Sequence, residues 1–315
     1  MKRADPGRLV IVSLPYFFAA TIKLKRIYLF FSYNCKSLTF STKTCVKLRV
    51  SRYFKATLDP EKMKNIKKYF LEYLLIITTI LLTVSGFWNI FFGADAKPNP
   101  YQSIHFIINF SWLFLMLYQL SLIGNNQAIK HKRVGLSILF FGPLLVAQAV
   151  VLAIHSAHRN LGSAEGDFMI VQNTSAPLEI GLIILLAFIL RKRRKIHAAF
   201  LIGTVVLMLG ISIFFLLLAV APELIGYGMY ITLFVGLLFF LKDRRNGWPT
   251  LLSSSFFILN DFIFSILNKY DLIRPLTDFV GSRNQLIAFF VSFIVLLFLL
   301  IATGITNKRR VAALR

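Results

Sequence analysis

Residues 101–135, YQSIHFIINFSWLFLMLYQLSLIGNNQAIKHKRVG, decide the fold class of this chain. The stretch begins with an apolar run that is long enough to cross a bilayer. It ends in a basic turn at residues 130–133, followed by Gly135. This order predicts a transmembrane helix that leads into a cytoplasmic turn.

A stripe of three side chains follows this predicted helix. His105, Trp112 and Gln119 are each seven residues from the next, so they share one side and drift by only about 20° per step. Asn109 and Met116 fall beside them. Polar groups are costly when they face lipid, so this side is expected to face the interior of a helix bundle. Two interpretations are open, a helix–helix contact and the wall of a ligand or cofactor site, and the contact is favoured.

Composition places the whole chain in the membrane class. Of its 315 residues, 57% are hydrophobic, and the mean hydropathy is +0.70. No soluble core needs such long apolar runs, so the lipid bilayer is the expected partner. The net charge of +23 does not require nucleic acid, because cytoplasmic loops of membrane proteins collect Lys and Arg. Protein partners and oligomeric state are left open.

The first 62 residues differ from the rest. They are rich in Lys and Arg, contain both cysteines, and have one apolar run, at residues 9–20, that is too short for a span. We interpret residues 1–62 as a poorly ordered, basic cytoplasmic extension. Met63, with lysines and an apolar helix after it, is an alternative start of the native chain. Residues 63–315 are then the transmembrane helical domain.

Apolar runs and charged turns alternate after residue 68, which predicts an all-α bundle of about eight membrane spans. Basic clusters precede the first span and follow the second, fourth, sixth and eighth, which predicts that both termini are cytoplasmic. The predicted spans cover residues 69–92, 101–123, 134–155, 168–190, 197–221, 226–241, 251–267 and 286–304. The seventh span is short, but without it the basic C-terminal tail would lie outside.

Five histidines suggest a cofactor. In this topology His105, His155 and His158 lie near the outer surface, and His131 and His197 lie near the inner surface. Histidines that face each other across helices at equal depth are what axial haem ligation needs. His105 and His155 are the preferred pair for haem b, ahead of His131 and His197, which adjoin Lys and Arg clusters. Interfacial, solvated histidines are the alternative.

Two carboxyl groups lie inside predicted spans. Glu179 is near the middle of the fourth span, and Asp261 is well inside the seventh. Such groups are costly in a membrane and predict a proton relay or ion site. The alternative for Glu179 is a neutral group hydrogen-bonded to Gln148 or Ser175, and Asp261 could instead lie near the membrane surface.

Recognisable enzyme motifs do not decide the function. The sequence contains no P-loop, H-E-x-x-H, G-x-S-x-G or dinucleotide fingerprint, so an enzyme activity is left open. Two glycines in the fifth span, Gly203 and Gly210, predict a close helix contact.

One stretch resembles a known family. His105, Trp112, Gln119, the pair Leu122-Ile123, then His131-Lys132 and Gly135 are similar to a pattern in the uncharacterised bacterial multi-span membrane proteins called DUF2306. A second pattern, a basic run and a His that opens a helix, resembles residues 191–197, although Ala198 stands where the family tends to have a basic residue. The resemblance covers about residues 101–218 and implies a bacterial inner-membrane location but no activity. Paired histidines give a weaker likeness to cytochrome b561-type membrane proteins.

Three functions are therefore expected as alternatives: haem-binding electron transfer, proton-coupled transport of a small solute, and a structural or accessory role in a membrane complex. In each of them the polar interior is built from His105, Trp112, Gln119, Gln148, His155 and Glu179.

Overall fold

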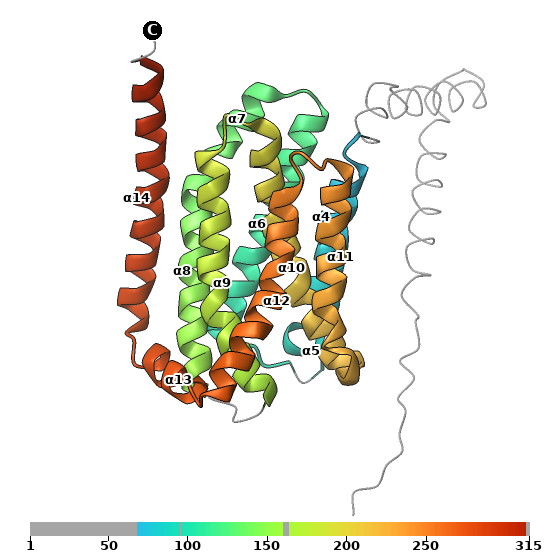
Figure 1. Ribbon diagram of the computed structural model, residues 1–315, viewed down its shortest axis with the longest axis vertical. Helices are drawn as coiled ribbons and strands as arrows, with labels where there is room; N and C mark the ends of the chain where they lie inside the picture. The colour runs from blue at the N-terminus through green and yellow to red at the C-terminus, as the bar shows by residue number, and fades with distance from the viewer. Residues whose placement is uncertain (1–67, 95, 160–163, 313–315) are drawn as a thin grey trace, which may run out of the picture. The chain divides into compact units, whose positions relative to one another are not determined.

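The computed structural model describes residues 68–94, 96–159 and 164–312, which are helical nearly throughout and contain no strand (Figure 1). They belong to one compact unit, Lys64–Arg315. The predicted all-α class is confirmed. The expectations for residues 1–62 lie outside the described residues.

The described helices follow the alternation of apolar runs and turns. In chain order they are α4 (Phe70–Gly86), α5 (Trp88–Phe91), α6 (Pro100–Gly124), α7 (Ala128–Gly135), α8 (Ile138–Arg159), α9 (Ala164–Ile189), α10 (Arg194–Val220), the 3₁₀ turn η1 (Pro222–Leu224), α11 (Tyr227–Lys242), α12 (Trp248–Lys269), α13 (Ile273–Gly281) and α14 (Gln285–Ala312).

Six of these helices are long and apolar enough to cross a membrane: α6, α8, α9, α10, α12 and α14. Two more, α4 and α11, are apolar but have only 17 and 16 residues. The predicted first span is interrupted, because the chain leaves the helix at Phe87 and continues as the short α5. The structure also adds α13, which lies across the lower end of α8 in Figure 1.

The sequence explains why α13 forms in a segment of mixed charge. Ile273, Thr277 and Val280 are buried and share one helical face. Arg274 and Asp278 lie between them on the other face. Buried residues at this spacing favour an amphipathic helix packed on the bundle. The charged residues keep the mean hydropathy of the segment too low for it to be predicted as a span.

The start of α6 is defined by a capping box. Asn99 Oδ1 accepts a hydrogen bond from the Gln102 backbone N–H at 2.8 Å, and the Asn99 backbone N–H donates to Gln102 Oε1 at 3.2 Å. Pro100 occupies the first helical position, where its missing N–H costs nothing. These contacts fix the register of α6 and therefore the direction in which His105 points.

The basic turns gather at one end of the bundle, the upper end in Figure 1. Lys195 after α9 pairs with Asp243 after α11, at 3.3 Å. Lys242 at the end of α11 pairs with Glu72 in the first turn of α4, at 2.7 Å. Arg191 Nη2 donates to the Gly304 carbonyl of α14 at 3.4 Å. Such exposed pairs add little stability, but they show that these turns lie on the same side.

Small residues bring the central helices close together. A Cβ added at Gly203 would collide with Ser253 of α12, and one added at Gly210 would collide with the Phe257 ring. The predicted close helix contact is confirmed. Prolines stand inside two spanning helices, Pro143 in α8 and Pro177 in α9, and the helices continue through both. The last helix, α14, packs against α8 and α9.

Candidate functional site

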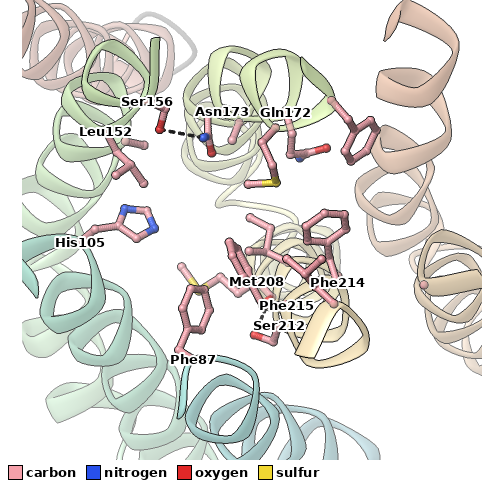
Figure 2. A pocket seen from close by; sticks show the side chains of 18 of the residues that line it. Phe87, His105, Leu152, Ser156, Gln172, Asn173, Met208, Ser212, Phe214 and Phe215 are labelled. Carbon is pink, nitrogen blue, oxygen red and sulfur yellow. Dashed lines mark hydrogen bonds between the residues drawn. The ribbon is translucent and has the colours of Figure 1, made fainter. Parts of the chain in front are cut away.

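A cavity of about 680 Å³ lies at the end of the bundle opposite the basic turns. It is lined by α4, α5, α6, α8, α9, α10, η1, α11 and α12, and Figure 2 shows some of the side chains that surround it. Most of its wall is apolar and rich in Phe. The polar lining side chains are Thr83, Gln102, His105, Asn109, His155, Ser156, Arg159, Gln172, Asn173, Ser212 and Asp261. A mainly apolar cavity with a few convergent polar groups is the usual form of a small-molecule site.

His105 presents a free lone pair to this cavity. Its Nδ1 lies 2.5 Å from Gln148 Oε1, and Gln148 Nε2 donates to the Leu145 carbonyl at 3.0 Å. The amide nitrogen of Gln148 is therefore engaged, so its oxygen must accept a proton from His105 Nδ1. The neutral ring then carries no proton on Nε2. The imidazole points from α6 into the space shown in Figure 2, so Nε2 can accept a hydrogen bond or bind a metal.

His155 lines the same cavity in a different way. Its Nε2 accepts a hydrogen bond from Asn99 Nδ2 at 3.0 Å, and its ring stacks on Tyr101 with centroids 4.5 Å apart. Its Nε2 lone pair is occupied by the residue that caps α6. His155 therefore tethers the end of α8 to the start of α6.

The two histidines lie at different levels of the bundle. His105 faces Gln148, and His155 is seven residues farther along the same helix, which is roughly 10 Å. Axial ligands of one haem iron must approach it from opposite sides at one level. The structure brings both residues to one cavity, and only His105 has a free Nε2 there.

Gln119, His131 and Gly135 meet at the opposite, basic end. In the amide orientation that satisfies its neighbours, Gln119 donates to His131 Nδ1 and accepts from the Gly135 amide at 2.9 Å. His197 is close to His131, and its Nδ1 donates to the Ala187 carbonyl at 2.8 Å. These contacts close the turn between α6 and α8. Gln119, His131 and Gly135 thus form a structural corner of the bundle.

This corner should weaken in acid. Burial first, and the neighbouring His197 second, lower the pKa of His131 below its ordinary value of 6.5. Because the folded-state pKa lies below the unfolded value, the neutral ring stabilises the protein fully above pH 6.5. This contribution is lost as the pH falls from 6.5 through the lower folded-state pKa. Protonation also removes the acceptor of the Gln119 hydrogen bond. The melting temperature of the wild type should therefore fall between neutral and acidic pH.

Replacement of His131 by Asn isolates this effect, because the Asn oxygen can still accept from Gln119 but does not titrate there. Thermal unfolding in detergent should show a smaller acid-dependent loss for His131→Asn than for the wild type. Parallel curves for the two proteins would contradict the assignment.

Trp112 lies in the centre of the stripe and is fully buried. Its Nε1 donates to Thr204 Oγ1 of α10 at 2.9 Å. Of the two interpretations of the stripe, Trp112 and Gln119 follow the helix-contact interpretation, and His105 follows the cavity-wall interpretation.

Glu179 is buried in α9. The sequence predicts Gln148 or Ser175 as its hydrogen-bond partner, but the structure places a different residue beside it. Glu179 is hydrogen-bonded to the side chain of Asn260 on α12, whose Nδ2 also donates to Gln172 Oε1 at 3.0 Å. Gln172 lines the cavity, so hydrogen bonds run from the cavity to Glu179. Asp261, half-buried, lines the cavity from the same helix as Asn260.

The sequence alone does not single out the neutral partners, which are Asn99, Gln172, Thr204 and Asn260, because neutral polar residues are common in membrane helices. One signal was available: Gln172 precedes Glu179 by seven residues, the same spacing that revealed the stripe in α6.

Comparisons of the chain with models of protein families, with curated proteins and with solved structures give no match. Within residues 68–312, so far as they are described, no three His, Cys, Asp or Glu side chains are grouped as metal ligands would be. The class that fold and site define is therefore a polytopic helical protein of membrane type with an internal cavity.

Proposed function

We propose that this chain is a multi-pass membrane protein that binds and carries a small, mainly apolar molecule through the cavity beside His105. The proposal includes eight spans, with α4 and α11 as the two short ones, and both termini on the cytoplasmic side. The gathering of basic turns at the end opposite the cavity supports this orientation, since cytoplasmic turns are enriched in Lys and Arg. A bacterial inner membrane is the location that we infer.

The observation that carries the proposal is the free Nε2 of His105 in an apolar, Phe-rich cavity. A lone pair at this place selects a ligand with a hydrogen-bond donor, such as a hydroxyl or amine group, on an apolar ring or chain. Transport is supported by the hydrogen-bonded connection from Gln172 at the cavity wall to Glu179, because intramembrane carboxyl groups often mark proton pathways.

Haem b is the second candidate, and the same histidine favours it. A metal-binding His usually donates its other ring N–H to a fixed acceptor, as His105 does to Gln148. His105 would hold the iron, Gln148 would fix its tautomer, and the Phe residues would surround the macrocycle. Haem would supply one-electron transfer. His155 would need to release Asn99 before it could also hold the iron.

A variant that fills the cavity tests the proposed function. Ala176 lines the cavity, whereas Leu178 on the same helix is 74% exposed on the bundle surface. Wild type, Ala176→Phe and Leu178→Phe would be purified in native lipid particles, and the bound small molecules identified by native mass spectrometry. A bound molecule present in the wild type and in Leu178→Phe should be lost from Ala176→Phe.

An absorption spectrum of the same samples, before and after dithionite, separates the two candidates. A Soret band that Ala176→Phe removes would identify haem, and a flat spectrum with a retained organic molecule would identify a solute. The same set of bound molecules in all three proteins would contradict both, and would leave the structural or accessory role.

A further inference from the structure

Glu179 is a titratable group in the middle of a spanning helix, and no cation among the described side chains lies beside it. Only 7% of it is exposed. The helices packed against α9 are α8, α10, α12, α13 and α14. Their described titratable groups stand near helix ends, except Asp261, which faces the cavity. Those groups are His155, His158, Arg159, Arg194, Lys195, His197, Lys269, Arg274 and Asp278. An ionised Glu179 would be a buried charge with no counter-ion, which is very costly.

Burial disfavours the ionised form of Glu179, and Asn260 is its polar partner. Its Nδ2 donates to Gln172 Oε1 at 3.0 Å, and its side chain is hydrogen-bonded to the Glu179 carboxyl group. Its Oδ1, although buried, has no hydrogen-bond partner within the described part of the chain. The bond to Glu179 must therefore also come from Nδ2, whose two hydrogens are then both used.

The unpaired oxygen of Asn260 lacks one donor, and Glu179 can supply it only when protonated. A carboxylate can only accept, so it would leave Oδ1 unpaired, at a cost of about 1–3 kcal/mol for a buried acceptor. A carboxylic acid can donate its O–H to Oδ1 while its carbonyl oxygen accepts from Nδ2. This reciprocal acid–amide pair satisfies every polar atom of both side chains.

We propose that Glu179 is the proton-binding site of this protein, and that it holds its proton in a reciprocal acid–amide pair with Asn260. The O–H bond of the acid breaks when the site empties, the carboxylate keeps the electron pair, and the proton passes to water. Because Asn260 is also bonded to Gln172, a ligand that displaces Gln172 at the cavity wall disturbs the pair. This link to the cavity rests on the proposed function, whereas the proton site itself does not.

The wild-type chain, reconstituted in lipid, tests the proton site by infrared spectroscopy. A protonated carboxylic acid absorbs above the amide I band, in a region where ionised carboxylates do not. At neutral pH we expect one such band per chain, which moves to lower frequency when the protein is labelled with ¹³C-glutamate. Glu72 pairs with Lys242 and Glu223 is exposed, so neither should contribute. Loss of the band in Glu179→Gln distinguishes Glu179 from the remaining glutamates, Glu61 and Glu165.

Two variants complete the test. Glu179→Gln should fold, because an amide can make the same reciprocal pair, and it should lose the whole band. Asn260→Leu removes the partner, so the band should stay and rise in frequency. Asp261→Asn is the matched control and should keep the wild-type band. Absence of the band in labelled wild type at neutral pH would overturn the proposal, as would its persistence in Glu179→Gln.

The same bands test the link to the cavity. Ala176→Phe should shift the band without removing it, since the added ring occupies the space beside Gln172. A band that is identical in Ala176→Phe and wild type would overturn the link while the proton site stands. The two proposals can also separate in the other direction. If Ala176→Phe loses the bound molecules but the wild type shows no carboxylic acid band, the proposed function stands and the proton site is wrong.

Discussion

Trp112→Ala is expected to lower the free energy of unfolding by about 3–5 kcal/mol, the usual cost of removing a fully buried large aromatic side chain. Trp112 has no exposed surface and lies in the main core. The truncation would leave a cavity between α6 and α10, and it would also remove the donor to Thr204 Oγ1. Chemical unfolding in detergent micelles, followed by circular dichroism, measures the change.

Two controls separate packing from hydrogen bonding. Thr204→Val removes the acceptor and nearly keeps the volume, so it should cost about 1 kcal/mol. Phe114→Ala lies on the same helix as Trp112, but 54% of Phe114 is exposed, so its effect should stay within about 0.5 kcal/mol. A Trp112→Ala protein as stable as Phe114→Ala would contradict the central place of this side chain.

His105→Leu is expected to have the largest effect on the cavity. For an organic ligand, loss of the hydrogen bond at Nε2 should weaken binding about tenfold, which corresponds to about 1.4 kcal/mol. For haem, loss of the free His105 Nε2 in the cavity should abolish the Soret band. The readouts are the molecules retained during purification and the absorption spectrum after dithionite.

Gln148→Leu tests whether the cavity needs the His105 tautomer that carries its proton on Nδ1. It leaves His105 in place but removes the acceptor of its Nδ1 proton, so the effect should be in the same direction and smaller. His158→Leu is the matched control, because His158 is exposed at the end of α8. Equal retention by His105→Leu and His158→Leu would show that the free nitrogen of His105 contacts no ligand.

Much of the fold could be predicted from the sequence, because apolar runs favour the lipid interior and basic turns favour water. The segments around α6, α8 and α10 were predicted to within a few residues. The break at Phe87 was not, since nothing in the hydropathy of residues 69–92 interrupts the run. The helix α13 was missed because its apolar face is short and its charges dominate the average.

The candidate site was predictable in its members but not in its pairings. The spacing of His105, Trp112 and Gln119 identified a side of α6, but one side of a helix passes several neighbours along its length. His105 therefore meets Gln148 and the cavity, while Gln119 meets the turn at the other end. The partner of Glu179 depends on how α9 and α12 are placed against each other, which periodicity within a single helix does not contain.

Pro177 gives α9 a mechanical property that the contacts alone do not reveal. It lacks the N–H that would bond to the Asn173 carbonyl, so the backbone ladder is weakened between Asn173 and Glu179. A hinge at this point would let the half of the helix that carries Gln172 swing while the other half stays packed. Such a swing would move Gln172 and disturb its hydrogen bond to Asn260. If Glu179 is the proton site that we propose, bending of this helix would then favour release of its proton.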